Sequence, residues 1–220
     1  VFTIPTRSYT IVNMARHSEL VKIPRIDRYV TKLALGTAPL GGLFTSVADS
    51  EAESTILAAV DAGINYFDTA PLYGYGIAEK RLGAALNKSG KPFVLSTKVG
   101  RVLEKIDPNK KVIDDSLGSF ADIDPNVIPV FDFSRDGILR SIEDSLKRLN
   151  VSSFDIAYIH DADDRIGEAI EKSYGVLDEL RSQGVLKGIG VGMNYCAPSI
   201  KAVKEMDLDI ILIAGRFSLL

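Results

Sequence analysis

Short apolar runs alternate with amphipathic segments from Leu33 to the end of the chain. Gly, Pro or a helix-capping residue marks each change, which is typical of repeated βα units. The apolar runs predict six strands, in the segments KLALGTA, INYFD, PFVLSTK, FDIAYIH, GIGVG and DLDIILIA. Because these runs are continuously apolar, the strands should be buried on both faces, as in a parallel sheet. An open doubly wound sheet and a (β/α)₈ barrel both fit this pattern.

The segments between the strands predict helices with recognisable ends. Ser50 and Glu53 form a capping-box pattern for a helix over residues 51–62, and Ser134 is expected to cap a later helix. Between the third strand and Ser134 lies a polar connection, residues 99–133, which is longer than most connections in compact domains. We expect it to be functional or mobile and to shape a substrate pocket.

Composition narrows the class of protein. At 220 residues and 46% hydrophobic, the chain can bury one sizeable core. The net charge is −3, with Lys and Arg scattered among Asp and Glu, so we expect no nucleic-acid partner. No apolar run approaches the roughly 20 residues of a membrane helix, and the N-terminus lacks a signal-peptide core. Cys196, the single cysteine, and the two histidines show no metal-ligand spacing. These features predict a cytoplasmic protein without a membrane partner or metal.

Four ionisable residues fall at or just after the C-terminal ends of predicted strands: Asp68, Tyr73, Lys98 and His160. In both candidate folds this edge of the sheet is where sites are built. Each residue alone has an ordinary structural explanation: a turn cap, a half-buried aromatic, a surface lysine, a satisfied histidine. Their convergence on one rim favours a shared chemical role.

That role is proton exchange with a carbonyl or hydroxyl oxygen. A free tyrosine has a pKa of ~10, and the charge of Lys98 is expected to lower it. Asp68 would keep the lysine charged and oriented, and His160 would donate a hydrogen bond to the substrate oxygen. These residues supply neither a metal nor a nucleophile, so hydride must come from a cofactor.

Two glycine-containing segments are weak candidates for nucleotide binding. GYGIAE, from Gly74, is similar to a dinucleotide fingerprint. However, Glu79 stands at the third glycine position, and five residues separate the motif from the preceding strand. GIGVG has the wrong spacing and indicates a strand packed closely against its neighbours. A Rossmann site is therefore not expected.

The segments FDTAPLYGYGIAEKRLGAAL, LSTKVG, YIHD and GVGMN together resemble the aldo-keto reductases. The resemblance implies a (β/α)₈ TIM barrel over residues 32–220, preceded by an N-terminal extension and lead-in of residues 1–31. It assigns the four residues above to the family's catalytic tetrad, with Tyr73 as general acid or base, and implies NAD or NADP as cofactor. FDFSRDGILRSIEDSLKRL, IHDADD and DLDIILIAGRFSLL are most similar to the aldose and pyridoxal dehydrogenase branch. This branch implies oxidation of an aldose from lactol to lactone, or the reaction of a small aldehyde.

The resemblance also implies residues that hold the cofactor. Asn194 matches the residue that binds the nicotinamide carboxamide, and further contacts are implied for Gly36, Thr37, Arg216 and Phe217. Met193 stands where many members have Ser, and Ala214 where many have Gln. Recognition of the carboxamide is therefore expected to differ from that of many relatives.

The sequence ends at Leu220, after the sixth strand, so the family's last two βα units are expected to be absent. Exposed apolar sheet edges recruit other chains, which makes a homo-oligomer one expectation. Two alternatives to the oxidoreductase stay open. One is a non-catalytic relative that senses a cofactor or binds a subunit, and the other is a Schiff-base aldolase with Lys98 as nucleophile.

Overall fold

Six parallel strands form one curved sheet in the computed structural model, which describes residues 17–106 and 120–216. The sheet order is β10-β9-β8-β5-β4-β3. The strands are β3 (Leu35–Gly36), β4 (Tyr66–Asp68), β5 (Val94–Val99), β8 (Ile156–His160), β9 (Gly188–Met193) and β10 (Ile210–Ile213). Each coincides with one of the six apolar segments, with β5 and β9 one residue longer than their segments at the C-terminal end, which confirms the strand prediction.

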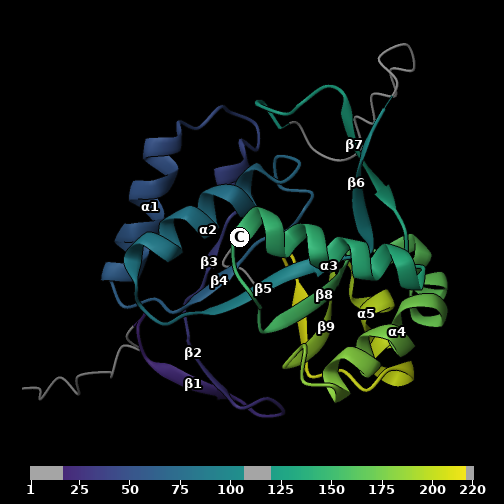
Figure 1. Cartoon of the computed structure of the whole chain (residues 1–220). Coiled ribbons are helices and arrows are strands. Elements are labelled where there is room, and N and C mark those ends of the chain that lie inside the picture. Colours follow the sequence, from purple (N-terminus) through teal and green to yellow (C-terminus); the bar gives the residue numbers. More distant parts are fainter. Residues whose placement is uncertain (1–16, 107–119, 217–220) are drawn as a thin grey trace, which may run out of the picture.

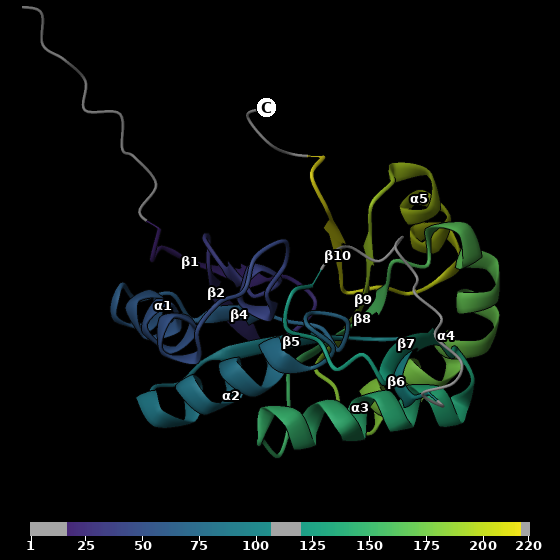
Figure 2. The same cartoon turned by 90° about the horizontal axis from the view of Figure 1, so that it is seen from above.

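Five helices cover the outer, convex side of this sheet in the described part of the chain (Figures 1 and 2). They are α1 (Asp49–Asp61), α2 (Ile77–Ser89), α3 (Arg135–Leu149), α4 (Ile166–Ser182) and α5 (Cys196–Glu205). The main core fills the space between strands and helices, with fully buried side chains such as Ile56, Phe67, Leu82, Leu95, Ile138, Ile159, Leu177 and Ile189. A doubly wound sheet would have helices on both faces, whereas this sheet curves around its inner face as a (β/α) barrel does. The barrel prediction is confirmed, and no described helix is long and apolar enough to cross a membrane.

The two predicted helix starts have different outcomes. Ser134 caps α3 as expected, because its Oγ accepts a hydrogen bond from the backbone N–H of Gly137. The capping box at Ser50 is wrong, since α1 already begins at Asp49 and its N-cap is Ala48, which makes no side-chain bond. Asp49 and Glu51 instead place negative charge in the first turn, where the helix dipole favours it.

The connection before α3 contains an antiparallel hairpin that the sequence does not predict. Its strands are β6 (Arg101–Lys105) and β7 (Val127–Phe131), and residues 107–119 lie outside the described residues. β6 follows β5 after a single residue, Gly100, whose φ of +90° lets the chain change direction there. Charged residues interrupt the apolar pattern of β6 (RVLEK), and Pro129 stands in the middle of β7 (VIPVF), where a proline argues against a strand.

A second hairpin closes the N-terminal end of the sheet. Its strands are β1 (Leu20–Ile23) and β2 (Arg28–Thr31). Its buried side chains form one cluster with residues of β5 and β8. The cluster consists of Ile23, Ile26 and Val30 from the hairpin and Val94, Ile156 and Tyr158 from the strands. The sequence treats this segment as a lead-in, and the domain boundary at residue 32 stays a prediction.

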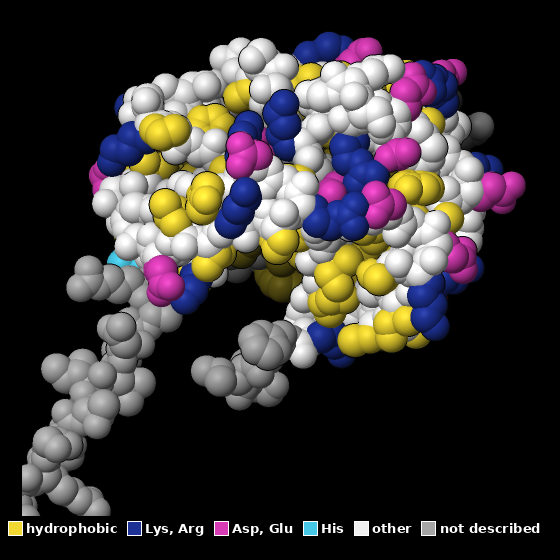
Figure 3. Space-filling view, turned by 90° about the horizontal axis from the view of Figure 1, so that it is seen from below, with side chains coloured by type: hydrophobic (Ala, Val, Ile, Leu, Met, Phe, Trp, Pro, Cys, Tyr) yellow, Lys and Arg dark blue, Asp and Glu magenta, His cyan; other side chains and the backbone are white. Residues whose placement is uncertain are grey.

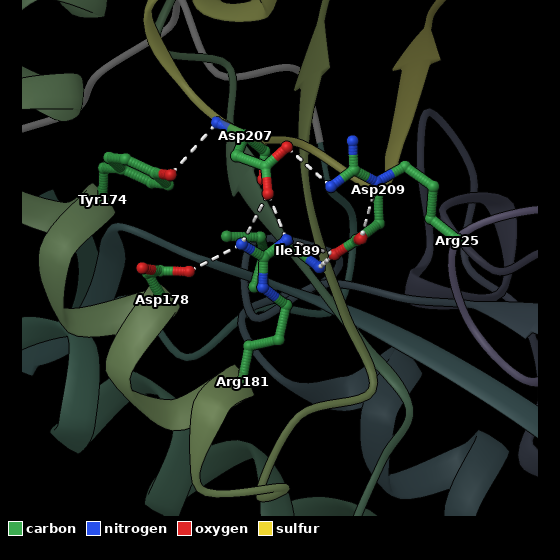
Figure 4. A network of polar contacts seen from close by, with 7 residues as sticks. All are labelled: Arg25, Tyr174, Asp178, Arg181, Ile189, Asp207 and Asp209. Atoms are coloured by element: carbon green, nitrogen blue, oxygen red, sulfur yellow. Dashed lines mark hydrogen bonds and ion pairs between the residues drawn. The ribbon is translucent and has the colours of Figure 1, made fainter.

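Charged side chains connect the β1–β2 hairpin to the C-terminal half of the chain at this same end (Figure 4). We call this set the basal network; it consists of Arg25, Asp178, Arg181, Asp207 and Asp209. Arg181 donates to Asp209 Oδ2 at 2.8 Å and to Asp178 Oδ1 at 2.6 Å. Asp209 Oδ2 also accepts from the backbone N–H of Ile189 at 2.9 Å, at the start of β9. On this side of the molecule, positive and negative side chains are interspersed with hydrophobic ones (Figure 3).

Candidate active site

The four predicted site residues lie close together at the C-terminal edge of the sheet. Asp68 ends β4, Lys98 lies near the end of β5, and His160 ends β8. These three strands are neighbours in the order β8-β5-β4, so their ends meet on one side. Tyr73 follows β4 in a turn, and its ring contacts that of His160 edge-to-face, with centroids 5.7 Å apart.

The lysine is held by a buried carboxylate. Lys98 Nζ donates to Asp68 Oδ2 at 2.5 Å and to the backbone oxygen of Thr69 at 2.9 Å. Ser96 Oγ donates to the other carboxylate oxygen of Asp68 at 2.7 Å. Burial is the largest influence on the pKa of Lys98 and lowers it, but Asp68 and Tyr73 together outweigh burial and raise that pKa. Lys98 is therefore a fixed cation, as the sequence predicts.

The phenol of Tyr73 lies beside this cation. Lys98 Nζ is 4.8 Å from the centroid of the Tyr73 ring. Burial raises the pKa of Tyr73, Lys98 lowers it, and Asp68 raises it again, so the pKa lies above its ordinary value. The effect of Lys98 has the expected sign, but burial outweighs it, and the expected net lowering does not occur in this structure. Tyr73 is thus a protonated phenol near neutral pH.

His160 is a neutral, buried imidazole. Burial, followed by the charges of Lys98 and Arg101, holds the pKa of His160 well below its ordinary value. Its Nε2 lies 3.4 Å from Asp161 Oδ2, and its Nδ1 is buried without a hydrogen-bond partner in the described part of the chain. A buried nitrogen without a partner is costly, so this position is suited to a ligand that completes it.

A cavity of about 220 Å³ opens beside these residues. It is smaller than the roughly 300–1,000 Å³ of typical small-molecule sites, so it suits the reactive end of a cofactor and a small substrate. Residues from the turns after β3 and β4, from the ends of four strands and from the connection before α3 line it: Ala38, Leu43, Leu72, Tyr73, Lys98, Phe120, His160, Asp161, Gly192, Met193, Asn194, Leu212 and Ala214. Phe120 lies in the long connection, which agrees with the expectation that this segment shapes a pocket.

The predicted cofactor contacts have different surroundings. Asn194 is exposed and lines the cavity, and Arg216 Nε donates to its backbone oxygen at 2.7 Å. Gly36 has open space where a Cβ would lie. Thr37 is fully buried, and its backbone N–H and Oγ1 both bond the backbone oxygen of Asp68, so its side chain supports β4. Phe217 lies outside the described residues, and the cofactor roles of all five stay predictions.

Three charged residues beside the site do not appear among the sequence-predicted residues. The guanidinium of Arg101 lies 4.0 Å from the ring centroid of Phe131, and its Nη2 is 3.8 Å from Asp161 Oδ2. Burial raises the pKa of Asp161, and Arg101 partly offsets this. Asp163 accepts the backbone N–H groups of Asn194 and Tyr195. The segment IHDADD directly after a strand end was the available signal for the two acids, whereas the position of Arg101 depends on the unpredicted hairpin.

The glycines before α2 serve packing. A Cβ on Gly74 would lie 2.2 Å from the backbone oxygen of Gly41, so the turn that carries Tyr73 is pressed against the turn after β3. Glu79 is fully buried and bonds Thr97 Oγ1 at 2.9 Å and Arg148 Nε at 2.5 Å. A buried, paired carboxylate at this position is incompatible with a phosphate-binding turn, which agrees with the expectation against a Rossmann site.

The fold and this rim of polar residues define a barrel of the kind that binds small molecules at the C-terminal ends of its strands. The model of the aldo/keto reductase family matches residues 32–220. The chain belongs to the aldo/keto reductase family.

Individual relatives agree with this assignment. The chain is 40% identical to D-threo-aldose 1-dehydrogenase of a Pseudomonas species, over 87% of this chain and 58% of that protein. It is also 40% identical to pyridoxal 4-dehydrogenase of Microbacterium luteolum, over 92% of this chain and 64% of that protein. Among solved structures, the glycerol dehydrogenase of Gluconobacter oxydans is similar with a TM-score of 0.65 and 30% identity, over 88% of this chain and 54% of that one. The chain thus spans about three fifths of the length of the first two relatives, and the predicted resemblance to aldose and pyridoxal dehydrogenases is confirmed.

Proposed function

We propose that this protein is an NAD(P)-dependent oxidoreductase that acts on an aldose, between lactol and lactone, or on a small aldehyde. The observation that carries the proposal is the contact of Tyr73 with both Lys98 and His160 at the edge of one cavity. The names of the relatives, an aldose and a pyridoxal dehydrogenase, supply the substrate class.

Tyr73 is the proton donor or acceptor in this proposal. In the reductive direction its phenol donates a proton to the carbonyl oxygen as the neighbouring carbon is reduced. In the oxidative direction the phenolate accepts the proton of the substrate hydroxyl. The raised pKa of Tyr73 keeps the phenol protonated at neutral pH and so favours the reductive role in the unliganded protein.

His160 and Lys98 act on the two oxygens between which the proton moves. A neutral imidazole donates one ring N–H to the substrate oxygen and fixes its orientation without adding a positive charge. Lys98 stabilises the negative charge that develops on the oxygen of Tyr73 when the proton leaves. Asp68 holds the lysine in place through the 2.5 Å contact.

The residues at the cavity fit a nicotinamide. The cofactor supplies the hydride, and the exposed amide of Asn194 is available to its carboxamide. The cavity is lined mainly by apolar side chains besides the tetrad, which suits a flat ring. The choice between NAD and NADP is left to experiment, and a cytoplasmic location stays an expectation from the single cysteine.

The Schiff-base aldolase is disfavoured by the state of Lys98. A nucleophilic amine must lose its proton, but the pKa of Lys98 is raised and its Nζ is bonded to a carboxylate. Borohydride trapping with an aldehyde substrate is therefore expected to give no adduct.

Two measurements test the proposal. Quenching or enhancement of NADH and NADPH fluorescence on titration with the purified protein reports cofactor binding. Turnover of L-fucose, L-galactose, D-arabinose and pyridoxal with each cofactor then reports the reaction. Binding together with turnover supports the proposal. Binding without any turnover would favour the non-catalytic alternative, and no binding would contradict both.

A further inference from the structure

Asn194 is the polar side chain on one side of the cavity. The lining residues that come from β9, β10 and the turns after them are Gly192, Met193, Asn194, Leu212 and Ala214. Only Asn194 among these carries a hydrogen-bonding side chain. Whatever polar group a ligand turns toward that side must therefore be met by this amide or by the backbone.

The two amide hydrogens of Asn194 are already engaged. Its Nδ2 donates to Asp161 Oδ1 at 3.0 Å and to Asp163 Oδ2 at 3.3 Å. Asp163 is itself fixed, because it accepts the backbone N–H groups of Asn194 and Tyr195 at 3.0 and 2.9 Å. Within the described residues, Oδ1 of Asn194 has no such partner.

The two carboxylates also decide which end of the amide faces them. A flipped amide would place Oδ1 against two carboxylate oxygens, which are acceptors only when ionised. Such a contact is repulsive, and the amide nitrogen would lose both acceptors. The orientation with Nδ2 toward the acids is therefore the one that the hydrogen-bonding chemistry favours.

We propose that Asp161 and Asp163 are positioning residues that lock the Asn194 amide, so that Asn194 offers a bound nicotinamide only a hydrogen-bond acceptor. The inference rests on the proposed function, because it assumes that a nicotinamide occupies the cavity. Its consequence is specific: the carboxamide must donate through its NH₂ group, and its carbonyl oxygen is not what Asn194 recognises.

The surroundings of Asp161 agree with a positional role. Its φ of +44° is unusual for a residue other than glycine, and such backbone persists where the surrounding contacts over-determine it. The contacts here are the Asn194 amide, Arg101 at 3.8 Å, and the bond from the Asp161 N–H to the backbone oxygen of Gly192 at 2.8 Å. Asp161 thus connects the end of β8 to the end of β9 through both its backbone and its side chain.

Cofactor analogues test, without measuring turnover, whether Asn194 acts only as a hydrogen-bond acceptor toward the nicotinamide. The 3-acetylpyridine analogue replaces the carboxamide NH₂ by a methyl group, whereas the thionicotinamide analogue keeps NH₂ and changes only the carbonyl. For the wild-type protein, we expect the oxidised acetylpyridine analogue to bind at least about tenfold more weakly than the parent cofactor, because it leaves an acceptor without a partner. The thionicotinamide analogue should bind within about threefold of the parent. Dissociation constants come from calorimetry with whichever of NAD or NADP the protein prefers.

Asp161→Asn should weaken the discrimination. The new amide can donate to Oδ1 of a flipped Asn194, which frees its NH₂ for the ligand, while Asp163 still favours the original orientation, so the acetylpyridine analogue should bind within about threefold of the parent. Asp164→Asn is the matched control, because Asp164 lies in the same segment, is exposed and makes no hydrogen bond to Asn194 within the described residues. Asp164→Asn should keep the tenfold preference for the parent cofactor over the acetylpyridine analogue. ADP-ribose, or its 2′-phosphate for an NADP enzyme, lacks the nicotinamide and should bind wild type and variants equally.

The outcomes separate the two proposals. Wild-type protein that binds neither dinucleotide contradicts the proposed function and this inference together. Wild-type protein that binds the parent and the acetylpyridine analogue equally overturns this inference alone, and so does full discrimination in Asp161→Asn. If Asp161→Asn loses ADP-ribose affinity and so shows a disturbed fold, Asp163→Asn takes its place under the same criteria.

Discussion

The two ends of the same strands carry buried charges for different purposes. At the N-terminal end, the basal network joins three separate segments, and its most buried carboxylate, Asp209, accepts from two arginines and a backbone N–H. At the C-terminal end, Lys98 and Asp68 are equally well paired, but the neighbouring His160 has a buried nitrogen without a described partner. A cavity adjoins the second cluster. Charged groups whose hydrogen bonds are all made hold elements together, whereas a cluster beside a cavity in which one polar atom lacks a partner can bind a ligand.

This contrast agrees with a general property of (β/α) barrels: active sites lie at the C-terminal face, whereas residues at the opposite face contribute to stability. Changes at the C-terminal cluster should therefore alter rates more than stability. Changes in the basal network should do the reverse. The predictions below start with the largest expected effect on activity.

Replacement of Tyr73 by Phe should have the largest effect on turnover. The phenol oxygen is the proposed proton donor and acceptor, and the loss of such a group lowers kcat by about 10²–10⁴-fold. We expect a fall of about 10³-fold, with the cofactor dissociation constant within about threefold of wild type. Steady-state kinetics and fluorescence titration measure the two quantities. Turnover retained within tenfold would refute the role given to Tyr73.

Replacement of His160 should have a smaller effect, because the imidazole orients the oxygen but does not exchange its proton. We expect His160→Ala to lower kcat/KM by about 10²-fold, at the lower end of the range for positioned polar groups. His160→Gln keeps an N–H donor and should recover part of that loss. If both variants lose activity equally, hydrogen-bond donation is not what His160 contributes.

The pH dependence should follow Tyr73 and not His160. The pKa of Tyr73 is raised, so the phenolate that oxidation needs is the minor form below pH 10, and its fraction rises tenfold with each pH unit. Oxidative kcat/KM should therefore increase with pH across the range 7–9, while the reductive rate, which uses the phenol, stays level. Because the pKa of His160 is well below 6.5, no inflection near that pH is expected. An inflection there that disappears in His160→Gln would contradict the neutral imidazole.

The sequence predicted the site better than it predicted what surrounds the site. Asp68, Lys98 and His160 could be placed because each lies at or next to the end of an apolar strand, and parallel strands bring their ends together. Arg101 could not be placed, since its position depends on a hairpin that the charged residues of β6 and the proline within β7 obscure in the sequence. The sign of the net pKa change at Tyr73 could not be foreseen either. It depends on how completely the ring is buried, which residue spacing does not report.

The basal network offers the complementary test, in which stability changes and activity does not. Arg181→Met removes the donor that contacts three aspartates at once: Asp178, Asp207 and Asp209. The side chain of Asp209 is only 4% exposed, so losing a charged partner there should cost about 2 kcal/mol. At about 2–4 °C per kcal/mol for a chain of this size, the Tm should fall by about 4–8 °C.

Arg135→Met is the matched control for this variant. Arg135 also makes two bonds to one carboxylate, that of Glu179, but both side chains are largely exposed, and such pairs contribute little. Its Tm should stay close to wild type, and kcat of the folded protein should be unchanged in both variants. A fall in kcat of more than tenfold in Arg181→Met at a temperature where it is fully folded would mean that the two ends of the barrel are coupled, and the separation drawn between them would be wrong.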